Sequence, residues 1–486
     1  MRSDALERNL LAGGFAGLFG GLVYGVALLS LGYLPTIGRL VGRESVRIGF
    51  SIELTIAVVL GAGFGLLLFG QSAGYGEALI WGLAYGAVLW FVGPLTVQPL
   101  ILTHHLGWDL ASAQAAFPNL TGQLIYGAMT ALVFAMLRGE RQTATLGVAL
   151  LTRGMIAGLL AGWLLGLLLQ SQNRLLELAG LVSSHSTALA WLIVLALGGL
   201  AGLAFALLYP DASDGAGPSL IRGTVYGFLW WVLGSLTLLP LLTGHGLTWS
   251  IGAVQSDLAT LPAYLLFGGG LALIYKWLAS LAQLLFSETT SRRNREGVGT
   301  EGLRSLAWGA AAGLIGGLLF SVVMLRIGYL PTLARLVGST SAGTGFTVEL
   351  IISFLIGSSY GLLFRHQSFD LGSALCWGMS YGVFWWILGP LTLLPILLGT
   401  SPRWSVGVVA SVFPRLIGHI AYGAGLGIAF YLLERRHRPW WVPHAEIRAV
   451  RAAARREQLL TSSPALWTLM AVLTLTLPVL LARSSL

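Results

Sequence analysis

The chain has 486 residues, of which 56% are hydrophobic and only 10% are charged, and its mean hydropathy is +0.80. About a quarter of the residues in a soluble domain are charged, so this chain cannot cover a soluble surface with polar groups. The formal net charge of +9 does not indicate nucleic-acid binding, because the arginines fall in loops between apolar runs. The single cysteine, Cys376, excludes a disulfide framework and a cysteine-based metal site.

Many of the apolar runs are near the roughly 20 residues that span a hydrocarbon core. In chain order, the predicted spans are 9–31, 49–70, 76–102, 112–137, 150–171, 187–209, 220–243, 251–280, 304–327, 346–364, 371–398 and 405–433, with a further span at 465–482. The first run is too long for the apolar part of a signal peptide and recurs later, so we expect it in the mature protein. These runs predict an all-α polytopic membrane protein with about 13 spans.

The spans repeat in groups of four. A shift of 296 residues superposes the last group on the first, and a shift of 141 superposes the middle group more weakly. Self-similarity on this scale indicates a triplicated unit. We expect repeats at 1–140, 141–290 (degenerate) and 291–438, followed by a basic juxtamembrane segment and a C-terminal transmembrane helix at 439–486. An even number of spans makes the repeats parallel, which favours a pseudo-threefold arrangement about the membrane normal.

Arginine placement predicts the orientation. Arginines concentrate on the side that holds the N-terminus and the junctions between repeats, so we expect a cytoplasmic N-terminus and an outside C-terminus. The expected partners are membrane lipids, and no nucleic acid. Contact with anionic headgroups is expected for the basic segment of Arg448, Arg451, Arg455 and Arg456.

Small residues recur at every fourth position in the first span of each repeat. They are Gly13, Gly17, Gly21 and Gly25, then Gly154, Gly158, Gly162 and Gly166, then Gly309, Gly313, Gly317 and Ser321. This spacing keeps them on one helix face, where small residues let membrane helices approach closely. The glycines therefore predict a tightly packed bundle, and none of them follows a strand as a phosphate-binding loop would.

The third span keeps one pattern in all three repeats: Gly-x-x-Tyr-Gly, then a Trp, a Gly, a Thr and a Pro. Pro94 and Pro390 should kink or break this helix, and the freed carbonyls need partners. The threonines between the breaks, which can supply hydroxyls, are Thr96, Thr237 and Thr392. Broken helices recur at transporter sites, whereas prolines near an outer end simply finish a span.

Aromatic residues share a register in the same span. They are Trp90, Trp231 and Trp386, with Tyr85, Tyr226 and Tyr381. An interfacial belt would explain the tryptophans. The tyrosines either pack in the core or line a shared central surface.

A charged pair recurs in the first and third repeats, as Arg39 with Glu53 and Arg335 with Glu349. Gly180 and Val194 take these positions in the middle repeat. Because the arginine and the glutamate are present together in two repeats and absent together in the third, we predict a salt bridge that pins the outer loop to the second span. The alternative is a glutamate that binds a proton or cation.

Other polar residues give weaker signals. His419 lies in a fourth span, where a haem or chlorin ligand is conceivable but a satisfied core residue is the simpler interpretation. Asp109 and Asp257 are expected to be helix N-caps. No i, i+4 histidine pair or His-x-x-Glu set lies on a predicted helix, and no catalytic triad or paired-carboxylate motif occurs, so we expect no metal, cofactor or catalytic residue.

The third repeat resembles a known family. Its glycine-rich first span, its third span with Gly-Pro and its fourth span, FPRLIGHIAYGAGLGIAFYLLERR (413–436), are similar to a YagU-like bacterial inner-membrane family of unknown function. The resemblance implies a bacterial inner-membrane location and assigns no catalytic residue.

The sequence thus favours a non-enzymatic integral membrane protein. It is either a permeation or transport module for a small or lipidic solute, or a packing-dominated scaffold or complex subunit. An enzyme acting on a lipid-linked substrate is the further alternative.

Overall fold

The computed structural model describes residues 2–69, 74–139, 147–210, 215–247, 249–286, 298–365, 367, 370–400, 402 and 404–436. Within these ranges every regular element is a helix, and 12 helices are long and apolar enough to cross a membrane. The chain is therefore an all-α, multi-pass membrane protein. The expected span at 465–482 and the basic segment with Arg448, Arg451, Arg455 and Arg456 lie outside the described residues.

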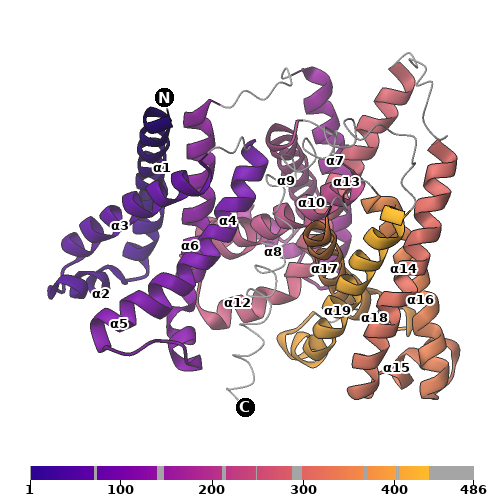
Figure 1. Ribbon diagram of the computed structural model, residues 1–486. Helices are drawn as coiled ribbons and strands as arrows, with labels where there is room; N and C mark the ends of the chain where they lie inside the picture. Colours follow the sequence, from indigo (N-terminus) through magenta and orange to yellow (C-terminus); the bar gives the residue numbers. More distant parts are fainter. Residues whose placement is uncertain are drawn as a thin grey trace. The chain divides into compact units, whose positions relative to one another are not determined.

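The first four spans contain six helices (Figure 1). They are α1 (Arg2–Ser30), α2 (Leu34–Gly38), α3 (Val46–Leu67), α4 (Tyr75–Val92), α5 (Gln98–Thr103) and α6 (Leu110–Arg138). α1 packs against α3 and α6, and α4 packs against α6. The short helix α2 continues into a 3-10 turn and lies at the end of α1 that is away from the N-terminus.

The middle four spans have a similar element order. They are α7 (Val148–Ser171), α8 (Leu176–Ala179), α9 (Thr187–Leu208), α10 (Ala216–Trp230), α11 (Leu239–Leu242), α12 (Ile251–Asp257) and α13 (Leu261–Phe286). α7 packs against α9, as α1 does against α3. The fourth span differs from α6 because a 3-10 turn at Leu258–Thr260 separates α12 from α13.

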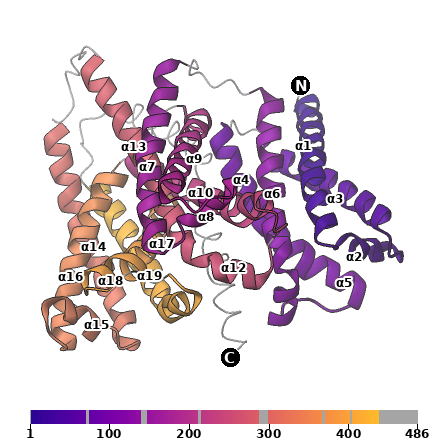
Figure 2. The same ribbon diagram turned by 180° about the vertical axis from the view of Figure 1, so that it is seen from behind.

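The third group repeats the contacts of the first (Figure 2). Its helices are α14 (Val298–Arg326), α15 (Leu330–Ala334), α16 (Ala342–Phe364), α17 (Leu371–Leu388), α18 (Leu394–Leu397) and α19 (Val406–Arg436). α14 packs against α16 and α19, and α17 packs against α19.

By its internal contacts the chain divides into two compact units. Among the described residues, one unit contains the chain up to Pro210 together with Val225–Phe267, and the other contains 215–224 together with Gly268–Arg436. The cavities and hydrogen-bond networks described below each lie inside one of these units.

Glycines bring the first two spans of each group into backbone contact. A Cβ built on Gly61 of α3 would lie 2.3 Å from the Gly13 carbonyl oxygen and 2.4 Å from the Gly17 Cα. In the other two groups, a Cβ built on Gly158 would lie 2.2 Å from the Gly198 carbonyl oxygen, and one built on Gly309 would lie 2.3 Å from the Gly357 carbonyl oxygen. Real Cβ atoms do not tolerate such distances, so these helices can approach this closely only with glycine at the crossing.

Candidate functional site

The third span of each group is interrupted by a π-helical segment. The segments are Gly93–Val97, Trp231–Leu238 and Gly389–Leu393. A widened turn changes which amide reaches each carbonyl, and here a threonine hydroxyl supplies a donor. Each threonine hydroxyl donates a hydrogen bond to the carbonyl five residues earlier. The pairs are Thr96 to Phe91 over 2.8 Å, Thr237 to Val232 over 2.8 Å and Thr392 to Ile387 over 3.1 Å.

A tryptophan from the following loop closes each break. The Trp108 indole donates to Thr96 Oγ1 over 3.0 Å, and the Trp249 indole donates to Thr237 Oγ1 over 3.1 Å. Trp404 donates instead to the Leu391 carbonyl. Protein groups therefore satisfy these parts of the break. Proline is not required for it, because Ser235 stands in the middle group where the others have Pro94 and Pro390.

The aromatic residues of the third span are core residues. Trp90, Trp231 and Trp386 are 2%, 1% and 0% exposed. Their indoles donate into the fourth span: Trp90 to the Ala116 carbonyl over 2.8 Å, Trp231 to Thr260 Oγ1 over 3.1 Å and Trp386 to the Val412 carbonyl over 3.1 Å. The interpretation as an interfacial belt is therefore wrong for these tryptophans, because packing against the fourth span removes them from the surface.

The tyrosines tie the third span to the second. Tyr85 donates to the Leu60 carbonyl over 2.8 Å, and Tyr226 donates to the Ala201 carbonyl over 2.7 Å. Tyr381 lies 2.6 Å from the Ser359 hydroxyl, which in turn donates to the Ile356 carbonyl. Core packing accounts for all three hydroxyls without a shared polar surface.

The predicted Arg39–Glu53 salt bridge is wrong. Arg39 pairs with Glu44 over 2.7 Å, and both side chains are more than half exposed. Glu53 is buried and has no hydrogen-bond or ion-pair partner among the described residues. Two loop residues of opposite charge are near neighbours on a short turn, so the local pair forms without ordering a long side chain across the bundle.

The third group differs from this in the surroundings of its glutamate. Glu349 is 3% exposed, and its two oxygens accept hydrogen bonds from two serine hydroxyls. Ser321 of α14 donates to Oε2 over 2.7 Å, and Ser353 of α16 donates to Oε1 over 2.5 Å. The first group has Gly25 and Ala57 at these positions, so Glu53 lacks both donors. Arg335 makes no ion pair with Glu349 in the described structure.

Glu349 lines a cavity of about 170 Å³ inside the third group. All four spans and α15 contribute to its wall, which also includes Gly389 and Pro390 of the π-helical segment. Most of the wall is apolar. Leu393 and Leu397 are exposed, so the cavity reaches the apolar surface of the bundle.

His419 lines the same cavity. Its Nδ1 lies 2.8 Å from the Arg415 carbonyl oxygen, one helical turn earlier on α19. Because a carbonyl only accepts, Nδ1 carries the proton and Nε2 of the neutral ring is left as an acceptor. A haem or chlorin ring does not fit a space this small, since pockets for ligands of ordinary size hold about 300–1,000 Å³.

Two further residues of the cavity wall each carry a buried polar atom without a hydrogen-bond partner in the described part of the chain. These atoms are the Tyr329 hydroxyl and the Trp385 indole nitrogen. The guanidinium carbon of Arg415 lies 3.7 Å from the centre of the Tyr329 ring. Burial raises the pKa of the Tyr329 hydroxyl, although Arg415 opposes this shift, so the group remains a neutral donor at physiological pH.

The middle group contains a cavity at the corresponding position, of about 130 Å³. Val194 replaces Glu349 there, and Tyr264 replaces His419, while Trp230 keeps the place of Trp385 and likewise has an unpartnered indole nitrogen. This second cavity has no carboxylate on its wall.

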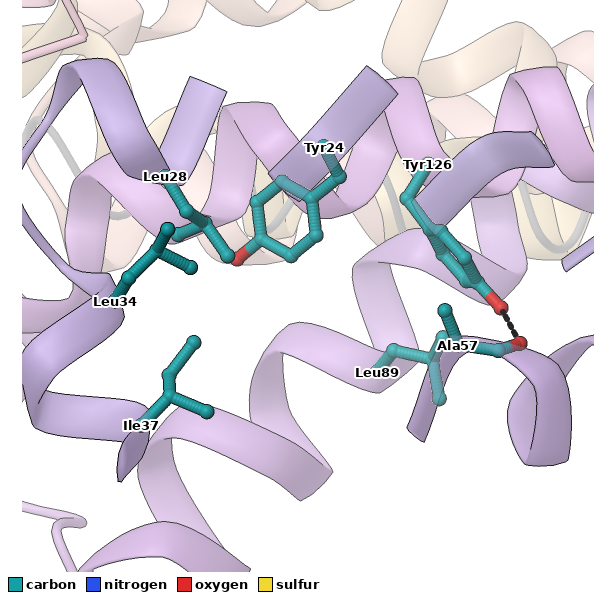
Figure 3. Close-up of a cluster of buried hydrophobic side chains, with 7 residues drawn as sticks. All are labelled: Tyr24, Leu28, Leu34, Ile37, Ala57, Leu89 and Tyr126. Atoms are coloured by element: carbon teal, nitrogen blue, oxygen red, sulfur yellow. Dashed lines mark hydrogen bonds between the residues drawn. The ribbon is translucent and has the colours of Figure 1, made fainter. Parts of the chain in front are cut away.

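In the first group several of the corresponding positions belong to a buried hydrophobic cluster. It consists of Tyr24, Leu28, Leu34, Ile37, Ala57, Leu89 and Tyr126. Figure 3 shows these side chains converging, with the Tyr126 hydroxyl meeting the Ala57 carbonyl at 2.7 Å. Tyr24, Leu89 and Tyr126 take the positions of Phe320, Trp385 and Tyr422 in the third group.

The sequence did not predict the ionic network around Arg174. Arg174 of the middle group pairs with Glu177 over 2.8 Å and with Asp257 over 2.9 Å. Asp257 ends α12 and its side chain does not cap a helix, so the predicted N-cap is wrong for this residue. Asp109 does cap α6, accepting from the Ser112 amide over 2.9 Å. The signal that could have found the network is the charge at Arg174, at the position of Tyr33 and Tyr329.

No protein-family model, curated protein or solved structure shows a significant match to this chain. In the described part of the chain, no group of three or more His, Cys, Asp or Glu residues could hold a metal ion.

Proposed function

We propose that this protein is a permeation or transport module for a small amphiphilic solute, and that the cavity of the third group is its solute site. The observation that carries the proposal is a cavity of about 170 Å³ with mostly apolar walls and a few polar side chains, open at the apolar surface of a membrane-spanning bundle. Such a site suits a solute with an apolar body and one polar end.

The size of the cavity limits the solute. An apolar cavity of about 150 Å³ in another protein stays dry and binds benzene, so a single ring or a short alkyl chain fits here. Entry from the bilayer is compatible with exposed Leu393 and Leu397 on the wall. We propose an inner-membrane location with a cytoplasmic N-terminus, supported by the distribution of arginines.

A packing-dominated scaffold is the second candidate. It is favoured by the glycine crossings, where the helix backbones of α1 and α3 are in contact. The scaffold and the transport module differ in one respect, since only the transport module needs the third-group cavity to be empty of protein atoms.

Flux measurements on proteoliposomes test the proposal. Osmotic shrinkage followed by light scattering would compare small amines, alcohols and carboxylates on the wild-type protein and on empty liposomes. Leu393→Trp places a bulky ring at the cavity wall, and Val97→Trp, at the corresponding exposed position of the first group, is the control. We expect faster entry of at least one solute class with wild-type and Val97→Trp protein and its loss with Leu393→Trp. Rates equal to those of empty liposomes for every solute would contradict the proposal and leave the scaffold.

A further inference from the structure

The polar groups of the third-group cavity define which solutes it accepts. The Glu349 carboxylate and Nε2 of His419 are hydrogen-bond acceptors, and two other residues of the wall, Tyr329 and Trp385, carry buried donors. Glu349 is the sole charged residue on this wall.

The carboxylate is built into the site and is held in place there. Each of its oxygens accepts from one serine hydroxyl, so its position is fixed by α14 and by its own helix α16. Burial disfavours the charged form of a carboxylate, and hydrogen-bond donors offset part of that cost. The protein supplies these hydroxyl donors and no positive charge within ion-pair distance, so the charge of Glu349 lacks a protein counter-ion in the described structure.

Aromatic rings complete the surroundings. Phe320, Trp385 and Tyr422 line the cavity together with Tyr329, and the Phe320 ring meets the His419 ring edge-on with centroids 4.9 Å apart. The faces of aromatic rings attract cations. Arg415 already covers one face of Tyr329 but is not itself on the cavity wall.

We infer that this cavity selects small organic ammonium ions with an apolar body, bound through the Glu349 carboxylate and the surrounding aromatic rings. The inference rests on the proposed function and names its solute class. His419 Nε2 accepts a second hydrogen bond from the ammonium group, and the apolar body occupies the wall formed by residues such as Leu333, Ile352 and Ile356.

The middle group provides a contrast inside the same chain. Its cavity keeps the aromatic and aliphatic wall but has Val194 in place of the carboxylate and Tyr264 in place of the imidazole. A cavity of this composition has no counter-ion for an ammonium group, so the cation selectivity is expected of the third-group cavity and not of the middle one.

Four probes of nearly equal size test the inference: benzylammonium, benzyl alcohol, ethylbenzene and benzoate. Binding to the full chain in nanodiscs is measured by equilibrium dialysis near neutral pH, and partition into empty nanodiscs is subtracted. We expect wild-type protein to prefer benzylammonium over benzyl alcohol by about tenfold or more, because a hydrogen bond to a charged group is stronger than one between neutral groups. Benzoate should not bind.

Glu349→Gln keeps the shape of the side chain and removes its charge. It should lower the preference for benzylammonium by about tenfold while leaving benzyl alcohol binding nearly unchanged. Glu53→Gln is the matched control, since Glu53 takes the same position in the first group, and it should change neither affinity. A melting curve of each variant confirms that it is folded. The comparison of the four probes on wild-type protein tests the selectivity even if a variant does not fold.

The outcomes separate the inference from the proposed function. Equal binding of alcohol and ammonium, or stronger binding of benzoate, overturns the cation selectivity and leaves a solute site. An unchanged preference in folded Glu349→Gln also overturns it. If none of the four probes binds, both the inference and the proposed solute site fail.

Discussion

The Ser353 hydroxyl donates a 2.5 Å hydrogen bond to Oε1 of Glu349, one turn earlier on α16. The first group has Ala57 in place of Ser353 and retains the acid as Glu53, so the two buried glutamates have different surroundings. The carboxylate of Glu349 accepts hydrogen bonds from two serines, whereas that of Glu53 accepts none. For this reason we assign the site to the third group.

Ser353→Ala should destabilise the protein by about 1–3 kcal/mol, because it removes one of the two donors to a buried carboxylate. Ala57→Ser in the first group is the converse variant and should be neutral or stabilising, since it offers Glu53 the donor that Glu349 has. Thermal unfolding in detergent measures both. A Ser353→Ala variant that melts like wild-type would show that this hydrogen bond does not hold the carboxylate.

The π-helical break of the third span should depend on its threonine. Thr237→Val removes the donor to the Val232 carbonyl and the acceptor of the buried Trp249 indole, and should cost about 1–3 kcal/mol. Thr237→Ser keeps the hydroxyl and should cost less. The measurement is the unfolding free energy of each variant. Equal losses would show that the Thr237 hydroxyl contributes no more than the methyl group that Thr237→Ser removes.

The glycine crossings should tolerate no added methyl group. Gly61→Ala places a Cβ against the backbone of Gly13 and Gly17, so we expect a loss of about 1–3 kcal/mol or more. Gly252→Ala is the control, because a Cβ there meets nothing within 4 Å. The control should be neutral or slightly stabilising. If both variants melt alike, α1 and α3 do not cross as closely as the structure shows.

The ion pairs formed by Arg174 and by Arg39, which follow the first span of their groups, should differ in strength. Arg174→Gln breaks contacts with Glu177 and with the largely buried Asp257, and should cost about 1–3 kcal/mol. Arg39→Gln breaks an exposed pair with Glu44 and should cost about 0–1 kcal/mol. Chemical unfolding of both variants is the measurement. A larger loss for Arg39→Gln would restore the prediction that this arginine pins the loop.

The sequence was sufficient for the fold class because composition and run length decide it. Twelve of the 13 predicted spans correspond to the 12 apolar helices of the described residues, and the thirteenth, at 465–482, lies outside them. The threonine hydroxyls of the third span lie at its break, as the sequence predicts. The pseudo-threefold arrangement of the repeats stays a prediction, as does the resemblance to the YagU-like family.

The site could be predicted only in part, because it depends on partners that are distant in the chain. Glu349 and His419 were both candidates, but nothing in the sequence showed that they share one cavity. Pairing Arg39 with Glu53 was wrong because loop arginines reach nearer acids first. A cavity is the space that side chains from four spans leave unfilled, so no local sequence pattern predicts it.

Binding of benzylammonium to the nanodisc-embedded chain, with and without Leu393→Trp, tests the central claim most directly. We predict saturable binding to wild-type protein and to Val97→Trp, and its loss in Leu393→Trp, because only that ring fills the wall of the third-group cavity. Saturable binding that survives in folded Leu393→Trp would place the solute elsewhere and contradict the account.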